Sequence, residues 1–151
     1  NIKFNIFGFR DFLPEKINEQ ISYAISETKN NDGLNLNLAL AYSSRYEILK
    51  GCEKLAKDLL NQKIKYDELL EENINDYLLT KDTPDPDLLI RTGGTHRLSN
   101  FLLWQCAYTE LYFTDKFWPD FNQNDLNEAI IDFQSRERKF GTIKTWKSKI
   151  I

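Results

Sequence analysis

The sequence has few of the residues that build disulfide frameworks and metal centres. It contains two cysteines, one histidine and no methionine among 151 residues. Cys52 and Cys106 show no C-x-x-C spacing, and each lies on the apolar face of an expected helix. We therefore predict two buried free thiols, with a disulfide or a metal role as the alternative.

The chain also lacks an excess of charge and any long apolar run. Its net charge is −3 with 28 % charged residues of both signs, so no broad basic field is present to hold nucleic acid non-specifically. An anion site must therefore be local. The apolar runs extend over only a few residues, and no signal peptide precedes the first expected strand, so we predict a cytoplasmic protein without a membrane span.

The absence of methionine bears on the extent of the protein. The chain opens directly on the alternating pattern IKFNIF at 2–7, with neither a methionine nor a leader, so we expect it to be a piece of a longer protein. Hydrophobic residues make up 41 % and aromatic residues 13 %, which is enough for one core. We predict a single domain over 1–151, with 142–151 as a peripheral tail.

Hydrophobic periodicity switches repeatedly between the strand and helix patterns, which indicates an α/β fold with a parallel sheet flanked by helices. Ser44 with Glu47 three residues later is typical of a capping box at the start of the second helix. The expected order is a strand at 2–7, a helix from 14 to 28, a strand at 34–40, a helix at 44–60, a short helix pair within 65–79, a strand at 88–90, a helix opening at 101, a strand at 111–113 and a last helix capped by Asn124 or Asp125.

The junction before the second helix is one candidate anion site. A strand runs into the turn at 41–47, and the first backbone N–H groups of a helix favour an anion. Arg45 lies in that first turn, either as a solvated residue or close to a ligand.

The stretch 91–99 is the stronger candidate. Arg91 directly follows a buried apolar run, and ligands of open α/β sheets lie outside the carboxyl ends of the strands. Two guanidinium groups, from Arg91 and Arg97, together with the Ser99 hydroxyl and the donors of the Gly93-Gly94 turn, suit the oxygens of a diphosphate. The alternative is two surface charges beside an ordinary turn.

Two further residues have open interpretations. Glu110 stands at the head of a buried strand and needs a partner, which is either a hard cation such as Mg²⁺ shared with phosphate oxygens or an arginine in a salt bridge. His96 is either a phosphate contact, a proton-transfer group or a plain polar loop residue.

These motifs resemble the C-terminal half of the cis-prenyltransferases, closest to the bacterial undecaprenyl diphosphate synthases. The resemblance is dense from 85 to 141 and looser from 1 to 60. It rests on PDLLIRTGG at 86–94, HRLSNFLLWQ at 96–105, ELYF at 110–113, WPDF at 118–121 and RERKFG at 136–141.

The resemblance implies an undecaprenyl diphosphate synthase-like fold, a homodimer and a Mg²⁺-dependent condensation of isopentenyl diphosphate onto an allylic diphosphate such as farnesyl diphosphate. The product is a Z-polyprenyl diphosphate, precursor of the lipid carrier for cell-wall glycan synthesis, so the enzyme would lie at the inner face of the membrane. Its motifs imply diphosphate contacts from Arg91, Arg97, Leu98 and Ser99, a metal ligand in Glu110 and a position beside the diphosphates for His96.

The closing motif has two interpretations. Arg136 and Gly141 resemble the segment that completes the neighbouring subunit's site in this family, whereas the residues alone indicate a solvated helix terminus. The family's N-terminal section, with its D-G-N-G-R motif, has no counterpart within 1–151. We therefore expect either the C-terminal part of a synthase, inactive without that section, or a non-catalytic accessory subunit of a cis-prenyltransferase complex.

Overall fold

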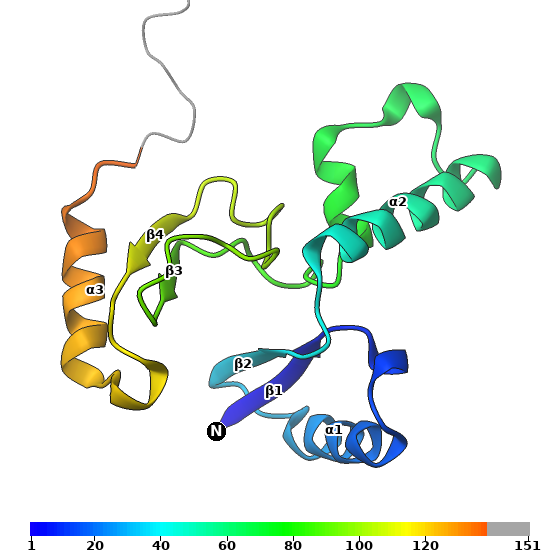
Figure 1. Cartoon of the computed structure of the whole chain (residues 1–151). Helices are drawn as coiled ribbons and strands as arrows, with labels where there is room; N and C mark the ends of the chain where they lie inside the picture. The colour runs from blue at the N-terminus through cyan, green and yellow to red at the C-terminus, as the bar shows by residue number, and fades with distance from the viewer. Residues whose placement is uncertain (139–151) are drawn as a thin grey trace, which may run out of the picture. The chain divides into compact units, whose positions relative to one another are not determined.

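A computed structural model describes residues 1–138 of the chain and divides them into two compact units. The first unit comprises 1–84 and a returning segment, 99–104; the second comprises 85–98 and 105–138. Figure 1 traces both units in chain order. Gly141 and the predicted tail at 142–151 lie outside the described residues.

The first unit begins with a strand–helix–strand motif. Strand β1 (Ile2–Phe7) pairs in parallel with β2 (Leu34–Ala39), in a register that places Ile2 opposite Leu34 and Phe7 opposite Ala39. Because parallel strands must be joined by a crossover, helix α1 (Glu15–Thr28) connects the two. This helix packs on β1. Pro14 is the N-cap residue of this helix, and Ile21 is the buried residue of its apolar stripe.

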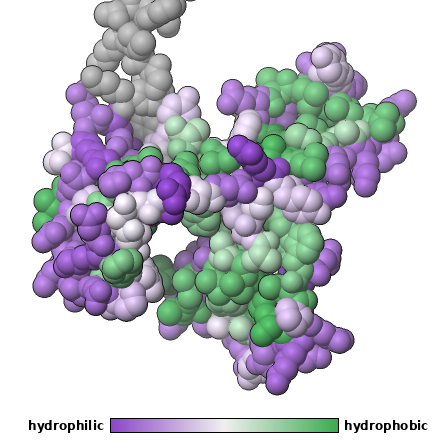
Figure 2. Space-filling view, viewed as in Figure 1, coloured by the Kyte–Doolittle hydropathy of each residue, from purple (hydrophilic) through white to green (hydrophobic). Residues whose placement is uncertain are grey.

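The outer row of this small sheet is apolar and exposed. Leu34, Leu36 and Leu38 of β2 alternate toward one face and are exposed, as is Ile2 of β1. Figure 2 shows apolar residues gathered at the surface over this part of the first unit.

Helix α2 (Ser44–Leu60) buries Ser44, Glu47 and Gly51 in the first unit. It packs against the 3-10 helix at Glu71–Tyr77, which follows a shorter one at Tyr66–Glu68. Gly51 lies at this contact, where a Cβ would stand at van der Waals distance from Leu78 (3.4 Å) and Ile74 (3.5 Å). The short helix pair predicted within 65–79 is therefore present, in 3-10 form.

The second unit is built on another parallel pair. Strand β3 (Leu88–Arg91) pairs with β4 (Glu110–Phe113), and helix α3 (Gln123–Ser135) packs on β4 with Ala129 fully buried. None of the helices within residues 1–138 combines the length and the apolar character that a bilayer crossing requires.

The predicted helix from 101 to 108 is wrong. The segment runs through turns, with Ser99, Asn100 and Leu102 at positive φ values of 51°, 64° and 44°. Residues in the left-handed region cannot propagate a right-handed helix. The apolar side chains that suggested a helix instead include Phe101, which packs edge-on against Tyr42 at 5.8 Å between ring centroids, and the buried Cys106.

The predicted N-cap of α2 is shifted by one residue. Ser43 is the N-cap, and its Oγ accepts from the backbone N of Tyr46. Ser44 is fully buried as the first helical residue, so the predicted capping box of Ser44 with Glu47 is wrong. Glu47 instead accepts hydrogen bonds from the Tyr42 hydroxyl at 2.5 Å and the Leu79 N at 2.8 Å.

Two smaller expectations also change. Helix α3 is capped by Asn122, whose backbone N donates to Asp125 at 2.9 Å; this cap lies two residues before Asn124 and three before Asp125, the predicted caps. Both cysteines are free thiols, but only Cys106 is buried; Cys52 is exposed, so its predicted burial is wrong. Burial raises the pKa of the Cys106 thiol.

Candidate functional site

The glycine turn after β3 is held against the segment that follows β4. The backbone N of Gly93 donates to the Lys116 carbonyl at 2.8 Å, and that of Gly94 donates to the Thr114 carbonyl at 3.0 Å. Both glycines have positive φ, 87° and 67°, a conformation that favours residues without a Cβ. The turn predicted from the sequence is thus a braced loop at the carboxyl end of β3.

Arg91 occupies the predicted place at the end of β3, half-buried, and holds the loop as well. Its Nη1 donates to the carbonyl oxygen of Arg97. The guanidinium therefore bridges the strand end and the far side of the loop. The Arg97 side chain is exposed, which suits a cation that meets a ligand from solvent.

The other predicted residues of the loop differ in exposure. His96 is exposed, with its ring 4.9 Å from the Phe113 ring of β4 between centroids, and Leu98 is half-buried. Ser99 is exposed and belongs to the first unit, whereas Arg91, His96, Arg97 and Leu98 belong to the second.

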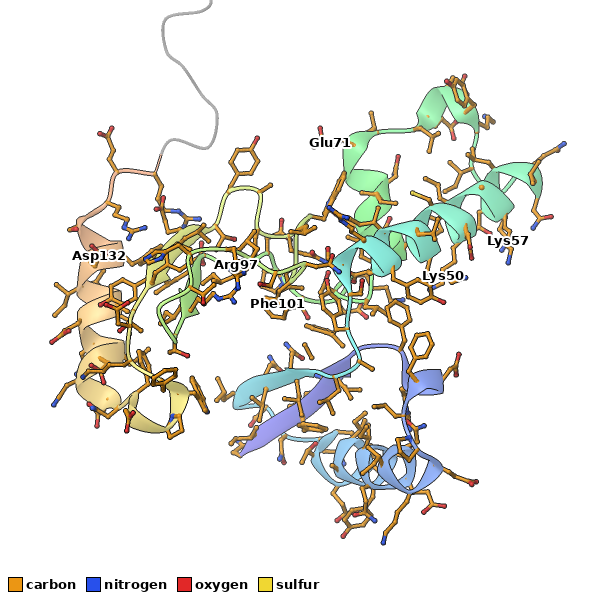
Figure 3. All side chains as sticks on the ribbon, in the orientation of Figure 1. Lys50, Lys57, Glu71, Arg97, Phe101 and Asp132 are labelled. Carbon is orange, nitrogen blue, oxygen red and sulfur yellow. The ribbon has the colours of Figure 1, made fainter. Side chains whose placement is uncertain are left out.

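Glu110 begins β4 and makes a salt bridge. Its Oε2 accepts from Nη1 of Arg136 at 2.9 Å, and Nη2 of Arg136 donates to Asp132 at 2.5 Å. The same Nη1 donates to the Leu111 carbonyl at 3.0 Å, and the hydrogen bond to Glu110 is the main cause that raises the pKa of Arg136. The salt-bridge alternative for Glu110 is therefore realised in this structure; Asp132 is labelled on α3 in Figure 3.

The strand register separates Glu110 from Arg91. Glu110 lies opposite Leu88 at the amino end of the pair, whereas Arg91 lies opposite Phe113 at the other end. Three residues along a strand span about 10 Å. The parallel pair thus carries a carboxylate at one end and a guanidinium at the other.

Within residues 1–138, no group of three or more histidine, cysteine or acidic side chains is placed to hold a metal ion. The Glu110 carboxylate has suitable chemistry for a hard cation. Its Oε2 accepts the hydrogen bond from Arg136, and Oε1 is the oxygen that could coordinate a metal ion. Mg²⁺ is commonly held by one or two carboxylates together with substrate phosphates. Among the described residues, Glu110 therefore fits the role of one ligand to such an ion.

The second predicted anion site, at the start of α2, is occupied by protein groups. The backbone N of Ser44 donates to the Asn100 carbonyl at 3.0 Å, and the N of Arg45 donates to Asn100 Oδ1 at 3.0 Å. The donors expected for an anion thus bind Asn100. The Arg45 side chain is exposed, in agreement with the solvated alternative.

Sequence reasoning missed two contacts near the site. Asn100 was not predicted to take part in the site, and the tolerance of asparagine for the left-handed conformation was the available signal. Arg138 pairs with Asp87 at 2.5 Å just before β3, in a cluster first interpreted as a solvated helix end; no local pattern links residues 51 positions apart.

Comparison with known proteins places this arrangement in a family. The sequence model described as putative undecaprenyl diphosphate synthase matches residues 1–141. The chain belongs to the undecaprenyl diphosphate synthase family. The resemblance seen in the motifs is thereby confirmed.

Curated relatives of the family agree. The chain is 48 % identical to the isoprenyl transferase of Geobacter sulfurreducens over 141 residues, which are 93 % of this chain and 57 % of that protein. It is 47 % identical to the isoprenyl transferase of Clostridium perfringens over 143 residues, 95 % of this chain and 56 % of the relative. The chain thus spans a little over half the length of these transferases.

Solved structures confirm the α/β fold with parallel strands. Lavandulyl diphosphate synthase from Lavandula x intermedia, in complex with dimethylallyl diphosphate, superposes with a TM-score of 0.90 at 39 % identity, over 93 % of this chain and 61 % of that chain. A probable undecaprenyl diphosphate synthase from Campylobacter jejuni gives a TM-score of 0.79 at 37 % identity, over 93 % and 64 %.

Proposed function

We propose that the complete protein containing this chain is a cis-prenyltransferase that condenses isopentenyl diphosphate with an allylic diphosphate. The observation that carries the proposal is the braced loop after β3, which presents the exposed Arg97 beside the half-buried Arg91 in a chain of this family. Guanidinium groups bind diphosphate oxygens in a bidentate manner.

The residues have distinct proposed roles. Arg97 and the Ser99 hydroxyl bind the diphosphate of isopentenyl diphosphate, Leu98 contributes its backbone, and Arg91 supplies charge while it holds the Arg97 carbonyl. His96 lies beside the diphosphates. These groups orient the homoallylic double bond toward the allylic carbon, whose bond to the departing diphosphate breaks.

Glu110 is the proposed metal ligand in this chain. Bound Mg²⁺ would neutralise charge on the diphosphates. For Glu110 to serve it, the carboxylate either keeps Arg136 on Oε2 and uses Oε1, or exchanges the guanidinium for the metal. Arg136 therefore sets how firmly this carboxylate is held before substrate arrives.

The assembly and location are also proposals. We propose a homodimer in the cytoplasm, working at the inner membrane face, with Arg136 and Gly141 in the segment that completes the partner's site. Arg136 is the first residue of that segment, and its hydrogen bonds to Glu110 and the Leu111 carbonyl hold it against β4 of its own chain.

The function is tested with full-length protein, isotopically labelled isopentenyl diphosphate, farnesyl diphosphate and Mg²⁺. We expect extractable polyprenyl diphosphate with new Z double bonds, and no product with EDTA. Absence of turnover alone, with turnover restored by a second family member, would identify an accessory subunit instead.

Glu110→Gln is expected to raise the Mg²⁺ concentration needed for half-maximal activity by about 10- to 100-fold. Glutamine keeps the size and one oxygen but loses the charge that a hard cation requires. Asp132→Asn is the matched control, because Asp132 is the other carboxylate on Arg136. An unchanged Mg²⁺ requirement in Glu110→Gln, checked by direct titration of metal binding in the presence of substrate, would remove Glu110 from the metal site.

A further inference from the structure

Asn100 directly follows the predicted substrate contact Ser99 and binds the start of α2 within the first unit. We infer that it is a positioning residue for isopentenyl diphosphate, an inference that rests on the proposed function. Its Nδ2 donates to Ser43 Oγ at 2.8 Å, its Oδ1 accepts from the N of Arg45 at 3.0 Å, and its carbonyl accepts from the N of Ser44 at 3.0 Å. Asn100 therefore accepts from two backbone N–H groups in the first turn of α2.

The anchor is partly buried and continues along the segment. Ser44 is fully buried, and its Oγ accepts from the backbone N of Leu103 at 2.9 Å. The indole N–H of Trp104 donates to Asn75 Oδ1 at 2.7 Å. Phe101, labelled in Figure 3, packs edge-on against Tyr42. The segment 99–104 is thus held at several points within the first unit.

This anchor determines where Ser99 lies. Ser99 and Asn100 both have left-handed backbone conformations, with φ of 51° and 64°. Two adjacent residues in that region are uncommon and persist when surrounding contacts hold them. Because Asn100 is tied to α2 on both of its amide atoms, the Ser99 hydroxyl is presented from a defined turn, two residues after Arg97.

The contacts also explain why the helix start does not bind the anion itself. Helix N-termini attract phosphates through their unpaired N–H groups, but here Asn100 accepts from two of them. The N–H groups at the start of α2 therefore bind Asn100 in place of an anion. If Ser99 is displaced, we expect weaker binding of isopentenyl diphosphate and no change in binding of the allylic diphosphate.

The test compares variants of Asn100 in the full-length protein. Asn100→Gly removes both side-chain bonds, and glycine adopts the positive φ without steric cost. Asn100→Asp keeps an acceptor for the Arg45 N–H, accepts from the Ser43 hydroxyl and is favoured by the helix dipole. We expect Asn100→Gly to raise KM for isopentenyl diphosphate by about tenfold, with KM for farnesyl diphosphate unchanged, and Asn100→Asp to stay close to the parent protein.

Two controls separate positioning from stability. Asn122→Gly removes the asparagine cap of α3, a comparable loss of helix capping that should leave both KM values unchanged. Ser43→Ala removes the partner of Nδ2 and gives a second reading if Asn100→Gly does not fold, with an expected rise of about threefold in KM for isopentenyl diphosphate.

An unchanged KM for isopentenyl diphosphate in both Asn100→Gly and Ser43→Ala would overturn the inference. Equal changes in both KM values, or a fall in kcat alone that follows the loss of folded protein, would show a structural role only. If the parent protein does not consume isopentenyl diphosphate, the proposed function fails instead, and that result is visible before any variant is made.

Discussion

Arg97→Ala in the full-length protein is expected to lower kcat/KM for isopentenyl diphosphate by about 10²- to 10³-fold. The guanidinium of Arg97 is exposed, and a diphosphate would accept two charge-assisted hydrogen bonds from it. Two such bonds are worth about 3–4 kcal/mol, and roughly 1.4 kcal/mol corresponds to a factor of ten. The loss should be visible in initial rates at subsaturating isopentenyl diphosphate.

Lys57→Ala is the matched control for Arg97→Ala. Lys57 is an exposed cation near the end of α2, labelled in Figure 3, and is not assigned to the site. Arg97→Lys should recover only part of the loss, because an ammonium group lacks the planar fork. If Arg97→Ala and Lys57→Ala behave alike, Arg97 does not bind the diphosphate and the proposed site is wrong.

Glu47→Ala is expected to lower the free energy of unfolding by about 3–5 kcal/mol. Glu47 is 2 % exposed, and its carboxylate accepts from the Tyr42 hydroxyl and the Leu79 backbone N. Alanine would leave both donors without this acceptor. Burial of the Tyr42 side chain, together with its hydrogen bond to Glu47, raises the pKa of Tyr42, so the neutral hydroxyl is the form that donates.

Urea-induced unfolding of the full-length protein, followed by far-ultraviolet circular dichroism, measures this loss. Glu53→Ala is the control, because Glu53 pairs with Lys50 on the exposed side of α2 and such pairs contribute about 0–1 kcal/mol. Glu47→Gln should fall between them, since it retains one carbonyl oxygen. A loss below about 1 kcal/mol for Glu47→Ala would mean that the network is not part of the stabilising core.

Local patterns in the sequence were sufficient for most elements of the fold. The period-2 patterns at 2–7 and 34–40 and the helical stripe through Ile21 correspond to β1, β2 and α1. The Gly93-Gly94 pair predicted a turn, and both residues adopt the positive φ that this requires. Arg91 was placed at the end of a buried strand, where β3 ends. Each of these inferences depends on neighbours within one turn or one strand.

The same local rules failed where partners come from distant parts of the chain. Glu47 has the spacing of a capping box, yet its partner at Leu79 lies 32 positions away. The apolar run from 101 suggested a helix, but its turns are held by contacts with α2 more than 50 positions earlier.

By itself, the sequence determined the α/β class, the strand that ends in Arg91 and the family motifs of the loop. Only the tertiary structure decided that Asn100 occupies the start of α2 and that Arg136 holds Glu110. The physical reason is that periodicity and capping depend on interactions between residues close together in the sequence. The hydrogen bonds of a packed interior depend instead on which distant segments folding brings together.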